Sequence, residues 1–101
     1  YDGVIVGHGL AGAAVGWHDR WRGLRVLLVD RGGLAASGVA AGLVTPVAGG
    51  KVTKTWRWDD AFPVAEAFYR RVEAEAGREL YHARGAVRLF ADAGERDRFA
   101  R

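Results

Sequence analysis

The sequence predicts an α/β fold with a parallel sheet, and three observations support that prediction. A short apolar run, residues 4–6, stops at three glycines with the spacing G-x-G-x-x-G, which are Gly7, Gly9 and Gly12. Apolar residues then recur at helical spacing as far as Trp21. A second apolar run, residues 25–29, ends on Asp30. This order of strand, glycine-rich turn, helix, strand and acidic residue predicts a Rossmann-like βαβ unit that binds a dinucleotide.

Each glycine has its own role in such a turn. Gly7 allows the sharp reversal out of the strand, and Gly9 lets the backbone approach a pyrophosphate without a Cβ in the way. Gly12 lets the helix pack closely against the sheet. The free N–H groups of the first helical turn, which contains Leu10, Ala11 and Gly12, would then face the phosphates at the positive end of the helix dipole.

The acidic residue suits the ribose of an adenosine. Asp30 stands 23 positions after Gly7, close to the separation of about 20 residues in dinucleotide-binding units. Its carboxylate can accept hydrogen bonds from both ribose hydroxyls. Arg31 follows it and could pair with a 2′-phosphate, but Asp30 would repel that phosphate, so NADP is a minor alternative.

Length and composition limit what the chain can be. Its 101 residues, 50% apolar and 27% charged, are typical of a globular protein with one small core. A dinucleotide-binding domain normally needs more parallel strands than this length supplies. We therefore expect residues 1–101 to be the N-terminal portion of such a domain, with the rest of it and a substrate domain in a longer enzyme.

The residue types also bear on metals and partners. The chain has no cysteine, and its three histidines lack metal-ligand spacing, so neither a disulfide nor a metal site is expected. No apolar run of about 18 residues and no signal peptide is present, which favours a cytoplasmic protein that does not bind membranes. The net charge of +3 comes from arginines spread among acids, so nucleic acid is a disfavoured partner. The oligomeric state is left open.

The middle of the chain reads as irregular and extended. Residues 32–42 are rich in Gly and Ala, and they form either a backbone track along the ligand or a mobile surface loop. Residues 43–47 are expected to be extended, and Gly49-Gly50 to form a turn. Residues 51–58 alternate polar and apolar side chains, which predicts an edge strand with Trp56 and Trp58 on one face.

The last part of the sequence predicts two helices and a strand. Asp59 or Asp60 caps the first helix, Pro63 falls in its first turn, and Gly77 ends it. Its expected buried stripe consists of Phe62, Ala65, Tyr69, Val72 and Ala76. Residues 85–90 are a strand candidate, and residues 95–101 begin a further helix.

Taken together, these segments resemble the FAD-dependent D-amino acid oxidase superfamily. The resemblance rests on residues 4–12, on Asp30 and above all on residues 36–46, Ala-Ser-Gly-Val-Ala-Ala-Gly-Leu-Val-Thr-Pro. Residues 54–57, the helix over 60–76 and the strand over 85–90 are also similar to that family. The glycine motif is shared with all Rossmann-type flavoproteins, whereas the Ser-x-x-Ala-Ala-Gly-Leu segment is closer to this superfamily.

The resemblance implies FAD as the cofactor and a small amine or amino acid as the substrate. Its pyrophosphate would bind at the glycine turn and its ribose at Asp30, while Ser37 would reach the phosphates or ribose. Ala41, Gly42 and Leu43 would lie near the flavin ring. In an enzyme of this family the substrate-binding and catalytic residues would come from later in the chain. Within residues 1–101 only Tyr81, His82 and Arg88 are candidates, and a structural role is favoured for each. Two alternatives stay open: an NAD(P)-binding Rossmann enzyme, and the flavoprotein domain of a tRNA-uridine modification enzyme.

Overall fold

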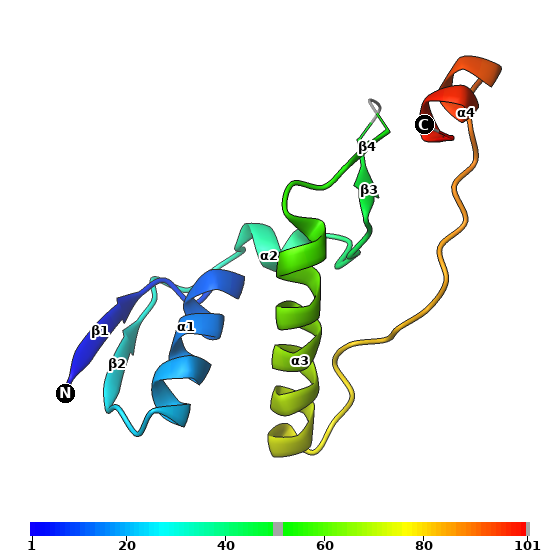
Figure 1. Cartoon of the computed structure of the whole chain (residues 1–101). Helices are drawn as coiled ribbons and strands as arrows, with labels where there is room; N and C mark the ends of the chain where they lie inside the picture. Colours follow the sequence, from blue (N-terminus) through cyan, green and yellow to red (C-terminus); the bar gives the residue numbers. More distant parts are fainter. Residues whose placement is uncertain (50–51, 101) are drawn as a thin grey trace. The chain divides into compact units, whose positions relative to one another are not determined.

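A computed structural model describes residues 1–49 and 52–100. The chain divides into two compact units, Tyr1–Leu43 and Val44–Arg101, each of which has its own secondary structure (Figure 1). The first unit contains the glycine motif and the acidic residue. The second contains the long helix.

The first unit is a βαβ unit, which confirms the predicted fold class. Strand β1 (Gly3–Val6) leads through the glycine turn into helix α1 (Leu10–Trp21), and the chain returns in strand β2 (Val26–Val29). The two strands are parallel, with Gly3 opposite Val26 and Val6 opposite Val29. A short helix, α2 (Ala36–Val39), follows in the loop. The carboxyl ends of both strands therefore meet at the glycine turn.

Helix α1 packs on one face of this sheet because small residues line its contact surface. A Cβ at Gly12 would lie 3.5 Å from Cγ2 of Ile5, and one at Gly16 would lie 3.5 Å from its Cδ1. Gly23, just past the helix C-cap, has a φ of +77°, a conformation that ends helices and favours glycine. On the other face, Val4 and Val6 are 60% and 85% exposed.

The second unit consists of a hairpin and two helices. Strands β3 (Val47–Ala48) and β4 (Thr53–Lys54) pair antiparallel. Helices α3 (Trp58–Ala76) and α4 (Ala93–Phe99) follow. Among the described residues, only Val52, Val72 and Glu95 are buried. Of the stripe predicted for α3, Val72 is buried and Ala76 is exposed.

Of the edge strand predicted over residues 51–58, only Thr53–Lys54 is a strand, and the prediction is wrong for Val52 and beyond Lys54. Arg57 adopts a left-handed conformation with φ +52°, and α3 already begins at Trp58. The rings of Trp58 and Phe62, one helical turn apart, stack with their centroids 4.4 Å apart. This i, i+4 contact favours the helix over the alternating pattern. Of the predicted Gly49-Gly50 turn, Gly50 lies outside the described residues, as does Lys51.

The start of α3 also differs from the prediction. Arg57 is the N-cap residue, and no side chain caps the helix. Asp59 and Asp60 lie in the first turn, where their charge suits the helix dipole. Pro63 therefore falls in the second turn, where it has no N–H to donate to the Asp59 carbonyl.

Two further predictions near the end of the chain need correction. Residues 85–90 form no strand, since no partner strand lies beside them in the part of the chain that the structure describes. Instead, Arg88 donates to the Gly49 carbonyl and to the Glu95 carboxylate. The last helix begins at Ala93, because the Asp92 carboxylate accepts a hydrogen bond from the Glu95 N–H and caps it. Arg101 lies outside the described residues.

Candidate dinucleotide-binding site

The turn after β1 needs glycine at two positions for different reasons. Gly7 has a φ of +95°, which a residue with a Cβ adopts only with strain. Gly12 is needed for space, since a Cβ there would lie 1.9 Å from the carbonyl oxygen of Gly7. The sequence predicts close packing of Gly12 against the sheet, and in the structure the tightest approach at Gly12 is to the Gly7 carbonyl of the turn. The helix start and the turn form one packed piece of backbone.

The N-terminus of α1 is open to an anion. Its N-cap is Gly9, which has no side chain to cap the helix, and the first turn contains no acidic residue. The helical hydrogen bonds begin with the N–H of Ala13, which donates to the Gly9 carbonyl at 2.9 Å. The N–H groups of Leu10, Ala11 and Gly12 precede that bond, as expected of the donors at a helix start. These donors and the helix dipole favour a phosphate at this position.

Asp30 lies directly after β2 and is hydrogen-bonded on both oxygens. Oδ2 accepts from the backbone N–H of His8 and Oδ1 from that of Gly32, each at 2.6 Å. These N–H groups, that of His8 first, lower the pKa of the Asp30 carboxyl, so it is ionised at neutral pH. Each carboxylate oxygen has a second lone-pair direction and can still accept a hydroxyl donor. A cleft of about 390 Å³ opens beside it, lined by Val6, Gly7, Val29, Asp30 and Arg31.

Ser37 lies close to the glycine turn, although 28 positions separate it from Gly9. A Cβ at Gly9 would lie 3.5 Å from the Ser37 hydroxyl oxygen. The structure thus brings Ser37 to the turn. Ala41, Gly42 and Leu43 follow α2, and Leu43 is 81% exposed. Their place near a flavin ring stays a prediction.

Sequence reasoning missed the partners of Asp30. The His8 side chain is exposed, as expected for a turn residue, but its N–H is one of the two donors to the carboxylate. The second donor is the N–H of Gly32. Backbone donors carry no residue signature, because any residue except proline can supply them. Nothing in the sequence pattern could have identified them.

The three residues considered as contributors to catalysis have structural contacts. The Tyr81 ring stacks on that of Tyr69 with centroids 5.8 Å apart. Nδ1 of His82 lies 3.1 Å from the Glu79 carboxylate. Arg88 pairs with Glu95. No group of three or more metal-ligating side chains occurs within residues 1–49 and 52–100. None of the helices in those ranges has the length and hydropathy of a membrane span.

These features fit the adenosine and pyrophosphate part of a dinucleotide cofactor. The Gly12 contact leaves no room for a side chain, the helix start offers unblocked donors, and the Asp30 carboxylate keeps acceptor capacity. Fold and site together define a dinucleotide-binding βαβ unit.

The chain belongs to the DAO family of FAD-dependent oxidoreductases, which it matches over residues 2–101. It is 38% identical over 100 residues to the tRNA 5-methylaminomethyl-2-thiouridine biosynthesis bifunctional protein MnmC of Maricaulis maris (strain MCS10). The match covers 96% of this chain but only 16% of that relative. No solved structure matches the chain. The family is FAD-dependent, which favours FAD over the NAD(P) alternative.

Proposed function

We propose that the protein is an FAD-dependent oxidoreductase that oxidises a small amine or amino acid, by deamination or demethylation. In this proposal the chain supplies the site for the adenosine and pyrophosphate of FAD. The observation that supports it most is the arrangement in the first unit, where the glycine turn, the open start of α1 and the Asp30 carboxylate adjoin one another.

Different residues of the first unit would bind different parts of FAD. The N–H groups at the start of α1 would bind the pyrophosphate, and Gly9 would let the backbone reach it. The Asp30 carboxylate would accept hydrogen bonds from the ribose hydroxyls, and the Ser37 hydroxyl would contact the phosphates. FAD, when bound, supplies the hydride acceptor for the oxidation of an amine carbon, and the protein orients both partners.

Flavin absorption of the purified intact protein tests the cofactor. We expect a yellow protein whose FAD is released on denaturation. We also expect Gly9→Ala to lower FAD affinity without lowering the melting temperature of the flavin-free protein, because Gly9 has a φ of −76° and a Cβ there meets the Ser37 oxygen only at 3.5 Å. Gly85→Ala is the matched control, since a Cβ at Gly85 has nothing within 4 Å. Normal FAD affinity of Gly9→Ala would contradict a phosphate site at this turn.

Anaerobic reduction of the flavin identifies the substrate class. Mixing the protein with panels of small amines and amino acids should bleach the flavin absorption for at least one member. Failure of every amine, with the flavin fully bound, would leave the cofactor assignment intact and reject the substrate class.

A second candidate function follows from the similarity to the MnmC protein, whose name includes tRNA 5-methylaminomethyl-2-thiouridine biosynthesis. In this case the substrate would be a modified uridine in tRNA, which also carries an amine. Several arginines are already paired with acids, as in Arg57 with Asp60 and Arg70 with Glu73, so they offer little unbalanced charge to phosphates. This pairing favours the small-molecule substrate. Bleaching of the flavin by tRNA that contains this uridine, but by no free amine, would favour the tRNA substrate over the small molecule.

A further inference from the structure

We propose that Asp30 is a positioning residue, which holds the glycine turn in its phosphate-binding conformation before any ligand arrives. This role is separate from a contact with ribose hydroxyls and rests on the proposed FAD function. The proposal follows from two hydrogen bonds of one carboxylate to N–H groups far apart in the sequence.

Two successive N–H groups of the turn, those of Gly7 and His8, connect it to the end of β2. The N–H of Gly7 donates to the Val29 carbonyl at 2.8 Å, which continues the pairing of the two strands. The next N–H, that of His8, donates to Oδ2 of Asp30 at 2.6 Å. Oδ1 accepts the N–H of Gly32 at the same distance. The carboxylate thus joins the turn after β1 to the segment after β2.

The turn needs such a restraint because glycines make it intrinsically free. Gly7 has a φ of +95° and Gly32 a φ of +73°, and glycine reaches many other conformations at little cost. Residues 7–9 must nevertheless hold one conformation if the α1 N–H groups are to meet a pyrophosphate. A backbone that is ordered beforehand loses less entropy when the ligand binds. The hydrogen bond to His8 orders the backbone between Gly7 and Gly9.

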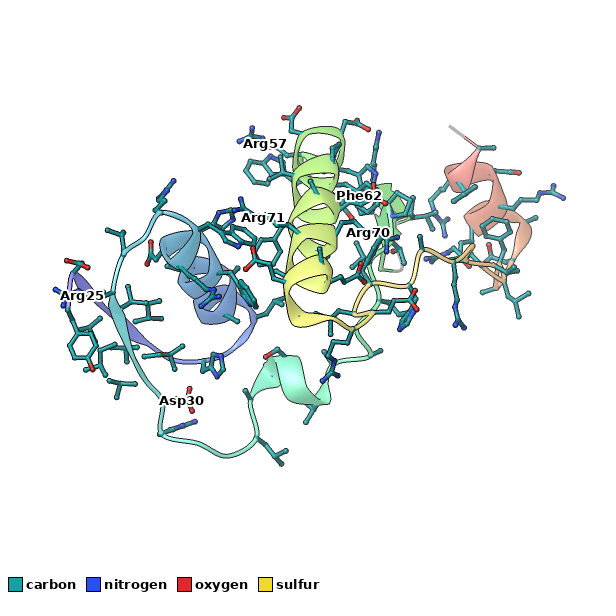
Figure 2. The ribbon with its side chains drawn as sticks, turned by 90° about the horizontal axis from the view of Figure 1, so that it is seen from below. Arg25, Asp30, Arg57, Phe62, Arg70 and Arg71 are labelled. Carbon is teal, nitrogen blue, oxygen red and sulfur yellow. The ribbon has the colours of Figure 1, made fainter. Side chains whose placement is uncertain are left out.

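This role makes a prediction that a ribose contact alone does not make. Loss of the carboxylate should weaken a pyrophosphate ligand even when that ligand has no ribose hydroxyls. ADP and 2′,3′-dideoxy-ADP differ only in those hydroxyls, so they separate the two roles. Asp2 provides a matched control at the opposite end of the same sheet, where its carboxylate accepts the N–H of Arg25 at 2.7 Å. Asp30 and Arg25 lie at opposite ends of β2 (Figure 2).

The experiment measures both nucleotides by calorimetry on the intact protein freed of flavin, and on Asp30→Asn and Asp2→Asn. An amide keeps the size of the side chain but can accept with only one of its two terminal atoms. We expect Asp30→Asn to weaken both nucleotides by roughly tenfold or more, and Asp2→Asn to change neither. A loss for ADP alone, with 2′,3′-dideoxy-ADP unchanged, would overturn the proposal and leave Asp30 as a ribose ligand.

Hydrogen exchange of the backbone amides tests the same idea in the absence of any nucleotide. In the ligand-free protein, the His8 and Gly32 amides should be protected, and in Asp30→Asn they should exchange faster while the amides of β1 stay protected. Fast exchange of the His8 amide in the unaltered protein would overturn the proposal. If the unaltered protein binds neither nucleotide nor FAD, the proposed function fails, whatever the exchange shows.

Discussion

The substitution Gly12→Ala tests the packing of α1 on the glycine turn. The added Cβ would lie 1.9 Å from the Gly7 carbonyl oxygen and 3.0 Å from its carbon. Carbon and oxygen atoms approach no closer than about 3.3 Å in ordinary contacts. Helix or turn would therefore have to move by roughly 1.4 Å, given the 1.9 Å separation. The turn cannot yield easily, since Gly7 is held by its hydrogen bond to Val29.

Two opposing effects decide whether Gly12→Ala raises or lowers the free energy of unfolding. Within a helix, alanine has a helix propensity more favourable than that of glycine by about 1 kcal/mol. Overpacking costs about 1–3 kcal/mol, and a rigid backbone oxygen as the neighbour puts Gly12→Ala at the upper end of that range. We therefore expect a net loss of roughly 2 kcal/mol in the free energy of unfolding of the intact protein. FAD affinity should fall as well, because the displaced helix carries the phosphate-binding N–H groups.

The matched control is Gly16→Ala, one turn further along the same helix. A Cβ at Gly16 would lie 3.5 Å from Cδ1 of Ile5, an ordinary contact. That variant should gain up to about 1 kcal/mol from helix propensity and bind FAD normally. Urea denaturation and flavin titration of both variants measure the difference. Equal stabilities of the two would refute the close packing of α1 on the Gly7 carbonyl.

Two further predictions concern pH and the isolated chain. N–H groups of Tyr81 and Leu80, with Arg70, lower the pKa of Glu73 from 4.5 to about 2, so its ionised form stabilises the fold. That contribution is complete above pH 4.5 and is lost as the pH falls toward 2, so the difference in unfolding free energy between the intact protein and its Glu73→Gln variant should narrow over that range. A difference that is constant with pH in urea denaturation would contradict this. Since only three described residues are buried, the 101-residue polypeptide by itself should melt without a cooperative transition. A sharp calorimetric transition with ordered near-ultraviolet circular dichroism of the tryptophans would disprove it.

Local patterns predicted the first unit because its chemistry is local. The positive φ at position 7 by itself calls for glycine, and the positive φ of Gly23, just past α1, does the same. The apolar runs 4–6 and 25–29 are separated by one helix, and a helical crossover is the usual connection between two parallel strands. The register pairs Val6 with Val29, so Asp30 follows β2 at the level where Gly7 follows β1.

The second unit was harder to predict because its patterns permit two structures. Alternation over residues 51–58 suits a strand, but the contact of Trp58 with Phe62 is available only in a helix. Residues 85–90 have strand composition, yet a strand exists only beside a partner, and Arg88 instead bonds to Gly49 and Glu95.

The sequence by itself determined the class of fold, the glycine turn and the acidic residue, since spacing and residue type specify them. Only the tertiary structure decided what those residues contact. The distance from a Cβ added at Gly12 to the Gly7 carbonyl depends on how α1 packs on the turn. The Asp30 carboxylate accepts hydrogen bonds from the N–H groups of His8 and Gly32. Backbone groups are the same in every residue except proline, so a partner of this kind leaves no trace in the sequence.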